Sequence, residues 1–101
     1  MFRHYVYIHR RGDTGEVFYV GKGTIRPKHS TQECERAYTK SRLNPWWRAI
    51  MEKHGYSVEI VASCVDDAAA QALEVDLIAQ YGRANLGRGP LVNLTDGGDG
   101  H

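Results

Sequence analysis

The sequence predicts a mixed α/β domain in which a β-hairpin is followed by a helix, a third strand and a second helix. Residues 4–10 and 16–21 alternate between apolar and polar side chains and are rich in Val, Ile, Tyr and Phe, which is typical of strands. Helix-capping residues bracket two later segments, and a β-branched run lies between these segments. Because 101 residues, 42% of them hydrophobic, have room for one core, we expect residues 1–101 to form a single domain.

The hairpin turn and the first helix have clear signals. Residues 11–15, with the sequence Arg-Gly-Asp-Thr-Gly, are typical of the turn in an antiparallel hairpin. Asn44 followed by Pro45 predicts a helix start, because asparagine caps the first turn and proline lacks an N–H that this turn does not use. Gly55 ends the helix, which we expect over about residues 45–54.

The second half of the chain contains the third strand and the second helix. Residues 58–63, Val-Glu-Ile-Val-Ala-Ser, are expected to form the strand. Asp66 and Asp67 cap a helix that runs to about Tyr81, where Gly82 ends it. We expect residues 91–94 to be extended and the glycines and aspartates after them to form a loop.

Alternation along the two hairpin strands separates their side chains into two faces. One face is expected to carry Val6, Ile8, Phe18 and Val20. The opposite face is expected to carry Tyr5, Tyr7, His9, Val17, Tyr19 and Gly21. If the aliphatic face packs on the helices, Tyr7 and Tyr19 emerge together on the other. An ordinary cross-strand aromatic pair, worth up to about 1 kcal/mol, is the alternative to a functional pair.

The second predicted helix contains a carboxylate that its apolar pattern does not explain. On a helical wheel its apolar stripe consists of Ala70, Leu73, Leu77, Ile78 and Tyr81. Glu74 lies inside this stripe, whereas Asp76 faces away from it. Since charged groups are rarely buried without a partner, Glu74 either pairs with an arginine or holds a divalent cation at the edge of a cleft. We favour the cation.

The distribution of charge favours a polyanionic partner. Residues 1–54 hold 11 Lys and Arg against 5 Asp and Glu, a net charge of +6, and residues 55–101 hold 2 against 7, a net charge of −5. A basic half that also contains most of the aromatic residues suits nucleic acid. The alternative is that the two halves differ without consequence on a solvated surface.

Other classes of protein are disfavoured. Cys34 and Cys64 have no CxxC spacing and the five histidines no metal-binding grouping, so we expect neither zinc nor a disulfide. No apolar run approaches the roughly 20 residues that cross a bilayer, and the first residues lack the apolar stretch of a secretory signal. We therefore expect an intracellular protein that does not bind membranes.

Short motifs spread over nearly the whole chain resemble the GIY-YIG nuclease superfamily. Two of them are the strand motifs Tyr5-Val6-Tyr7 and Phe18-Tyr19-Val20-Gly21-Lys22-Gly23, which precede Glu74 in a helix and Asn93 near the end. Three more are Arg36-Ala37-Tyr38, Asn44-Pro45-Trp46-Trp47 and Lys53-His54-Gly55-Tyr56, and the tail reads Asn-Leu-Thr-Asp-Gly-Gly-Asp-Gly. The resemblance is strongest to the small stand-alone branch found in phages and bacteria, although Tyr5 replaces the glycine of the first motif.

This resemblance implies a central three-stranded antiparallel sheet flanked by helices and the metal-dependent hydrolysis of phosphodiester bonds in DNA. By analogy, Glu74 is the ligand of one Mg²⁺ or Mn²⁺ ion, which keeps most of its waters and also binds the scissile phosphate. Tyr7 is the candidate base for the attacking water, and Tyr19 binds the phosphate or that water. Asn93 positions the site, or is an ordinary turn-capping residue. Lys22 favours the phenolate.

The resemblance leaves the catalytic arginine open. Arginine suits the role because its planar fork binds two phosphate oxygens. We favour Arg36, and Arg26 is the alternative. Lys40 stands where many members have histidine or tyrosine, so His29 or Tyr38 is a candidate for the second proton-handling group. The basic residues expected to bind nucleic acid are Lys22, Arg26, Lys28, Arg36, Lys40 and Arg42.

Two other functions stay open: a nucleic-acid-binding module with weak catalysis, and a module for protein interaction. Of Trp46 and Trp47, adjacent on a helix, we expect one to be buried and the other partly exposed. Gly21 and Gly23 suit either a close approach to phosphate or a bend at the strand end. The chain has no zinc finger or helix-turn-helix motif, so we expect low sequence specificity, with recognition that is shallow, directed by nucleic-acid structure, or supplied by a homodimer or a partner protein. The sequence does not distinguish DNA from RNA or nicking from double-strand cleavage.

Overall fold

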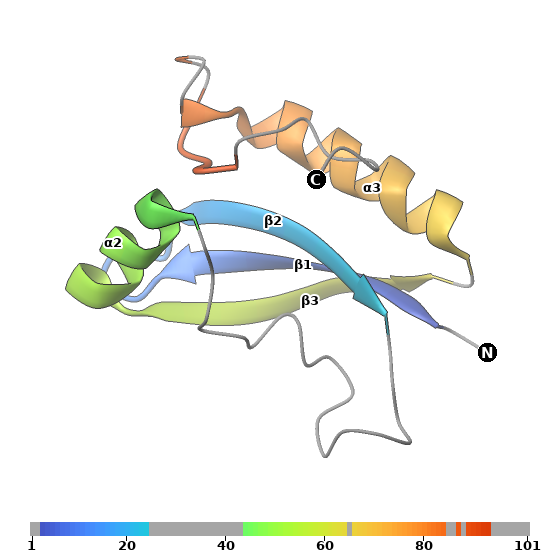
Figure 1. Ribbon diagram of the computed structural model, residues 1–101, viewed down its shortest axis with the longest axis horizontal. Helices are drawn as coiled ribbons and strands as arrows, with labels where there is room; N and C mark the ends of the chain where they lie inside the picture. Colours follow the sequence, from blue (N-terminus) through green and yellow to red (C-terminus); the bar gives the residue numbers. More distant parts are fainter. Residues whose placement is uncertain (1–2, 25–43, 65, 85–86, 88, 94–101) are drawn as a thin grey trace.

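The computed structural model describes residues 3–24, 44–64, 66–84, 87 and 89–93, and within them the elements follow the predicted order (Figure 1). The elements are β1 (His4–Arg11), β2 (Val17–Thr24), α2 (Pro45–His54), β3 (Tyr56–Cys64) and α3 (Asp67–Tyr81). The expectation of a mixed α/β fold with a three-stranded antiparallel sheet and two helices is confirmed for these residues.

Both helices begin and end at the predicted caps. The side chain of Asn44 accepts hydrogen bonds from the first turn of α2, and that of Asp66 accepts one from the first turn of α3. Gly55 and Gly82 end the helices with φ angles of 69° and 89°, which side chains with a Cβ disfavour. The local signals were therefore sufficient to define both helices.

The sheet has the strand order β2-β1-β3, and two β-bulges interrupt its pairing. The pairing of β1 with β2 shifts after His9, where β2 has one extra residue, Phe18. The pairing of β1 with β3 shifts after Val6, where β3 has one extra residue, Val61. Each extra residue changes which face the following side chains join.

The bulge at Phe18 makes the predicted faces of Val17 and Phe18 wrong. Alternation predicts that Phe18 shares a face with Val20. Instead Val17 and Val20 lie together in the core beneath α3, whereas Phe18 packs against Trp47. A bulge lets two consecutive residues oppose one residue of the neighbouring strand, and here Phe18 and Tyr19 are those residues.

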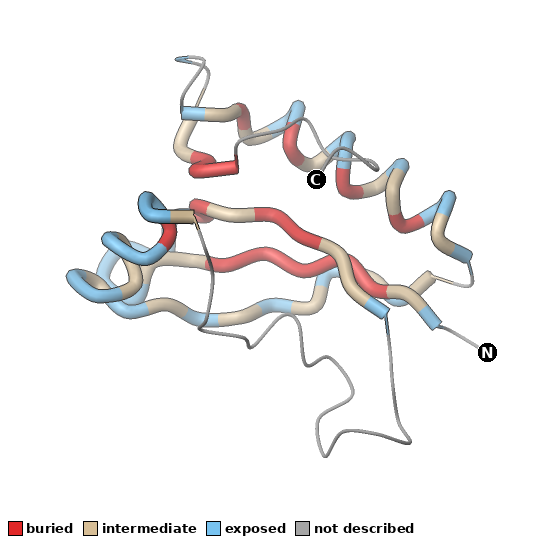
Figure 2. Tube along the Cα trace, in the orientation of Figure 1, coloured by how far each residue is buried: buried red, intermediate tan, exposed pale blue. Residues whose placement is uncertain are grey.

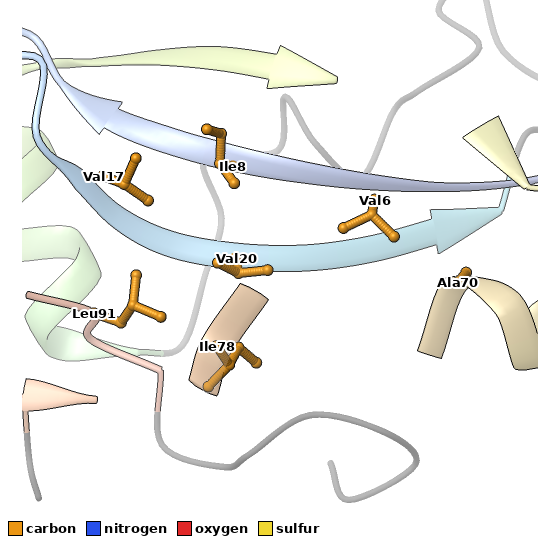
Figure 3. Close-up of a cluster of buried hydrophobic side chains, with 7 residues drawn as sticks. All are labelled: Val6, Ile8, Val17, Val20, Ala70, Ile78 and Leu91. Carbon is orange, nitrogen blue, oxygen red and sulfur yellow. The ribbon is translucent and has the colours of Figure 1, made fainter. Parts of the chain in front are cut away.

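The first layer of the core lies between the sheet and α3. Figure 3 shows its buried side chains, which come from both hairpin strands, from α3 and from Leu91. They are Val6, Ile8, Val17, Val20, Ala70, Ile78 and Leu91. Figure 2 shows the buried side of α3 turned towards β1 and β2. Burial of this aliphatic layer holds α3 across the sheet.

The opposite face of the sheet carries aromatic residues, and α2 packs against its end through Trp47. Trp47 is 0% exposed and Trp46 is 45% exposed, which confirms the expectation of one buried and one partly exposed tryptophan. The Trp47 Nε1–H donates a hydrogen bond of 2.9 Å to Nδ1 of His9 on β1. This bond fixes α2 to the central strand.

Neither of the two described helices combines the length and the apolar composition that a bilayer-crossing segment requires.

Trp47→Phe is expected to lower the free energy of unfolding by about 1–3 kcal/mol, because it removes the buried donor to His9. Trp46→Phe, the same substitution at the exposed neighbouring position, is expected to change it by less than about 0.5 kcal/mol. Urea unfolding of the two variants measures the difference. Equal effects would contradict the assignment of Trp47 as the tryptophan that joins α2 to the sheet.

Candidate active site

Two tyrosine rings lie across the glycines of β2. Tyr7 pairs with Gly21 in the β1–β2 register, and Tyr5 pairs with Gly23. The Cζ atom and hydroxyl oxygen of Tyr7 occupy the space that a Cβ atom on Gly21 would need, and Tyr5 occupies the same space at Gly23. The rings therefore explain both glycines, and neither the phosphate contact nor the bend that we considered is needed to explain them.

Tyr7 and Tyr19 lie on the same face of the sheet, as predicted. Their ring centroids are 6.3 Å apart. His9, also on β1, belongs to this face. Its ring is stacked on that of Tyr19 with centroids 5.5 Å apart, and it is tilted relative to the Tyr7 ring with centroids 5.0 Å apart. Tyr7 and His9 are fully buried and Tyr19 is half-buried. The two predicted phenols thus belong to one aromatic cluster.

His9 is a member of this cluster to which sequence reasoning assigned no role. The indole Nε1–H of Trp47 is only a donor, so Nδ1 of His9 must accept the hydrogen bond and carry no proton. The neutral ring then carries its proton on Nε2. Alternation did place His9 on the face of Tyr7, and that was the signal available in the sequence.

Glu74 occupies the buried side of α3, as the helical wheel predicts. Its exposed fraction is 8%, and the buried residues Ala70 and Ile78 lie one turn before and one turn after it. Those two residues belong to the core that contains Val6 and Val20. Asp76 is exposed, also as predicted. Glu74 is therefore a buried residue on the side of α3 that faces the strands β1 and β2.

Glu74 and the phenols start from opposite faces of the sheet. α3 covers the face of Val6 and Val20, whereas Tyr7 belongs to the other face. β2 is the outer strand on this side, and at Gly21 it has no side chain. A site that uses both groups therefore has to extend around the outer edge of β2.

Lys22 lies on the α3 face, where an ion pair holds it. Its Nζ donates a hydrogen bond of 2.9 Å to Oδ1 of Asp67, and Gln71 donates one of 2.6 Å to Oδ2 of the same carboxylate. The hydrogen bond from Lys22 is the main reason why the pKa of Asp67 is lowered. Because Asp67 is two helical turns from Glu74, the ammonium group is bound about 10 Å along α3 from that carboxylate.

Asn93 holds the outer edge of β2 through its side-chain amide. Its Oδ1 accepts a hydrogen bond of 3.0 Å from the N–H of Val20, and its Nδ2 donates one of 2.7 Å to the Val20 carbonyl. The N–H of Val92 donates to the Phe18 carbonyl at 2.8 Å. Asn93 is buried and acts as a short extension of the sheet beside Gly21. This geometry suits the positioning role expected for it.

The remaining predicted site residues lie outside the residues that the structure describes. Both candidate arginines, Arg36 and Arg26, are among them. So are the other basic and proton-handling candidates, namely Lys28, His29, Tyr38, Lys40 and Arg42. Their roles stay predictions.

The donor set of the site fits a hard cation. Within the described ranges no three His, Cys, Asp or Glu side chains gather as metal ligands. Mg²⁺ is commonly held by one or two carboxylates together with substrate phosphates and water, and Glu74 is the one carboxylate of the predicted site. Mn²⁺ prefers the same oxygen donors.

Comparisons with protein-family models, with curated proteins and with solved structures found no match to this chain.

The Lys22–Asp67 pair is expected to stabilise the fold in a pH-dependent way. The folded state lowers the pKa of Asp67, so its contribution is present above the ordinary carboxylate pKa of about 4 and is lost as the pH falls through the lowered value. Asp67→Asn should therefore reduce thermal stability at pH 7, with a difference from the parent that shrinks below about pH 4. Asp76→Asn, at an exposed position of α3, is the control. A difference for Asp67→Asn that stayed constant from pH 7 to pH 3 would contradict this.

Gly21→Ala is expected to destabilise the fold by about 1–3 kcal/mol, because the new methyl group overlaps the Tyr7 ring. Tyr7→Ala removes that ring. In the Tyr7→Ala background the same glycine substitution should therefore cost much less, which a double-mutant cycle of unfolding free energies measures. Equal costs in the two backgrounds would show that the ring is not what requires glycine at position 21.

Proposed function

We propose that this chain is a divalent-metal-dependent endonuclease that hydrolyses phosphodiester bonds in DNA with the chemistry of GIY-YIG nucleases. The observation that carries the proposal is the burial of Glu74 on the sheet side of α3, between Ala70 and Ile78. An apolar residue would suit that position better if packing were its only purpose. The basic charge of residues 1–54 supports a polyanionic substrate.

The resemblance to GIY-YIG nucleases suggests a role for each residue. Glu74 would hold the Mg²⁺ or Mn²⁺ ion, which would supply Lewis acidity for phosphodiester hydrolysis when bound. Tyr7 is the base that takes the proton from the attacking water. The water oxygen then bonds to phosphorus, the bond from phosphorus to one sugar oxygen breaks, and the leaving oxygen takes a proton from solvent. Asn93 keeps β2 in place beneath Tyr7.

An arginine and Tyr19 are proposed to contact the phosphate. Arg36, or Arg26 in its place, stabilises the charge that develops on the phosphate. Half-buried Tyr19 binds the phosphate or the water. The enzyme would work inside a bacterial cell or a phage-infected one with low sequence specificity of its own, and a second subunit or a partner protein would add specificity.

A nucleic-acid-binding module without efficient cleavage is the second candidate. The full burial of Tyr7 favours it, because a base that transfers a proton from water must be reachable by that water. The nuclease proposal therefore requires that substrate binding opens access to the Tyr7 hydroxyl. The two candidates give different results in one assay.

Nicking of supercoiled plasmid in the presence of Mg²⁺ or Mn²⁺ tests the proposal. Glu74→Gln preserves the size of the side chain and removes its charge, so it should lower the cleavage rate at least about a hundredfold. Asp76→Asn removes a carboxylate from the exposed side of the same helix and should leave the rate unchanged. Circular dichroism checks that both variants are folded.

Three outcomes decide between the candidates. DNA binding without metal-dependent cleavage by the parent chain would favour the binding module. Equal rates for the parent and Glu74→Gln would refute the role of the buried carboxylate. Tyr7→Phe, which removes only the hydroxyl, should abolish cleavage while DNA binding persists, and unchanged cleavage would exclude Tyr7 as the base.

A further inference from the structure

We propose that residues 56–60, the first half of β3, form an interface that pairs antiparallel with the same residues of a second copy of this chain. The two outer edges of the sheet differ. Val92 and Asn93 cover the edge of β2 through backbone and side-chain hydrogen bonds. Among the described residues, no hydrogen bond of this kind covers the outer edge of β3 at Val58 and Ile60. An open edge of this kind can add another strand.

The direction of the outward backbone groups follows from the hydrogen bonds at β2. Asn93 binds the N–H and C=O of Val20, so these groups point away from β1. In an antiparallel sheet the opposite residue, Ile8, must then point its own groups towards β3, where its partner is Glu59. Val58 and Ile60, on either side of Glu59, consequently point their N–H and C=O groups outwards.

A second hydrogen bond gives the same result. The N–H of Gly12, which follows β1, donates to the carbonyl of Gly55, which precedes β3. Residues 55, 57 and 59 therefore bond to the β1 side, and the alternate residues between them face the outer edge. Val58 is at the centre of these outward-facing residues.

A twofold pairing centred on Val58 gives the outward backbone groups hydrogen-bond partners and brings compatible side chains together on both faces of the sheet. Val58 then exchanges two hydrogen bonds with Val58 of the second copy, and Ile60 pairs with Tyr56. All three side chains belong to the aromatic face of the sheet, where Val58 and Ile60 pack against the tyrosine cluster and Tyr56 packs near Trp47. Apolar side chains therefore meet apolar side chains across the new strand pair.

The charges on the other face also fit this register. Ser57 and Glu59 are exposed on the α3 side, and a pairing centred on Val58 places each Glu59 opposite Ser57 of the second copy. Arg10 of the same chain already binds the Glu59 carboxylate at 3.2 Å. A pairing centred on Glu59 would instead place two carboxylates opposite each other, which is unfavourable. The sequence of the strand is thus self-complementary in one register.

The bulge at Val61 limits the interface to the first half of β3. Beyond it the faces exchange, because Cys64 packs on the α3 side whereas Val58 and Ile60 pack on the aromatic side. A strand with a bulge cannot continue the twofold pairing with matched faces. A pairing of five residues is small, so the dimer depends on protein concentration.

The dimer would contain a continuous six-stranded sheet with β2 at each outer edge. The two β2 strands would be five strand spacings, about 24 Å, apart, with both aromatic faces on the same side. For a nuclease this means two candidate sites on one side of the sheet. That consequence rests on the proposed function, whereas the pairing itself does not.

Sedimentation equilibrium of the full chain, from about 10 μM to about 1 mM, tests the interface. The parent chain is expected to form a dimer as its concentration rises. Ser57→Glu places a carboxylate opposite Glu59 in two symmetric contacts and should raise the dissociation constant by roughly twofold to thirtyfold. Ser57→Lys places a cation there and should lower it. Ser63→Glu, the same change at an exposed position of β3 beyond the bulge, is the matched control and should leave it unchanged.

Thermal unfolding separates this effect from one on the fold. Within a chain Ser57 pairs with Arg10, so glutamate at position 57 should favour the folded monomer while it weakens the dimer. A parent chain that stays monomeric up to about 1 mM would overturn the proposal. Equal effects of Ser57→Glu and Ser63→Glu on the dissociation constant would also overturn it. So would the finding that this edge binds a different protein and not a second copy of the chain. Plasmid cleavage by a monomeric chain would leave the nuclease proposal standing.

Discussion

The packing of Tyr7 over Gly21 is the contact on which the arrangement of the candidate site depends. It requires glycine at one position of β2, and it directs the phenol from the central strand towards the outer one. A slip of the β1–β2 register by one residue would place Val20 or Lys22 beneath the ring and exchange every side chain between the faces. None of three features can therefore change alone: the register of the hairpin, the glycine at position 21 and the direction of the Tyr7 phenol.

Asn93 connects this constraint to the far end of the chain. Its amide binds both backbone groups of Val20, the residue beside Gly21, and so takes the place of a neighbouring strand. The outer edge of β2 is thereby closed by a segment more than 60 residues away in sequence, while β3 has no equivalent cover in the described residues. One buried side chain thus covers the edge of the sheet at Val20 and holds β2 in place beside Gly21.

The sequence predicted the elements well because their signals are local. Asn44, Asp66 and the two terminal glycines define the helices through contacts with near neighbours, and the wheel position of Glu74 depends only on helix geometry. The face of Phe18 was predicted wrongly because a bulge is decided by how two strands fit, which alternation within one strand does not reveal. The bond between Trp47 and His9 likewise joins distant residues. Both candidate arginines lie outside the described residues, so the choice between them stays a prediction.

Burial of the Glu74 carboxylate carries the same desolvation cost whichever positive group balances its charge. A buried ion pair only offsets the desolvation of its members, so an arginine partner would make the carboxylate tolerable without making it useful for stability. A divalent ion differs because it needs further oxygen ligands from phosphate and water, and its site must therefore reach the substrate. Glu74 lies on the α3 side of the strands, and Tyr7 lies on the other face of the same strands. In the proposed nuclease, the phosphate therefore has to meet the carboxylate from one side of the sheet and the phenol from the other.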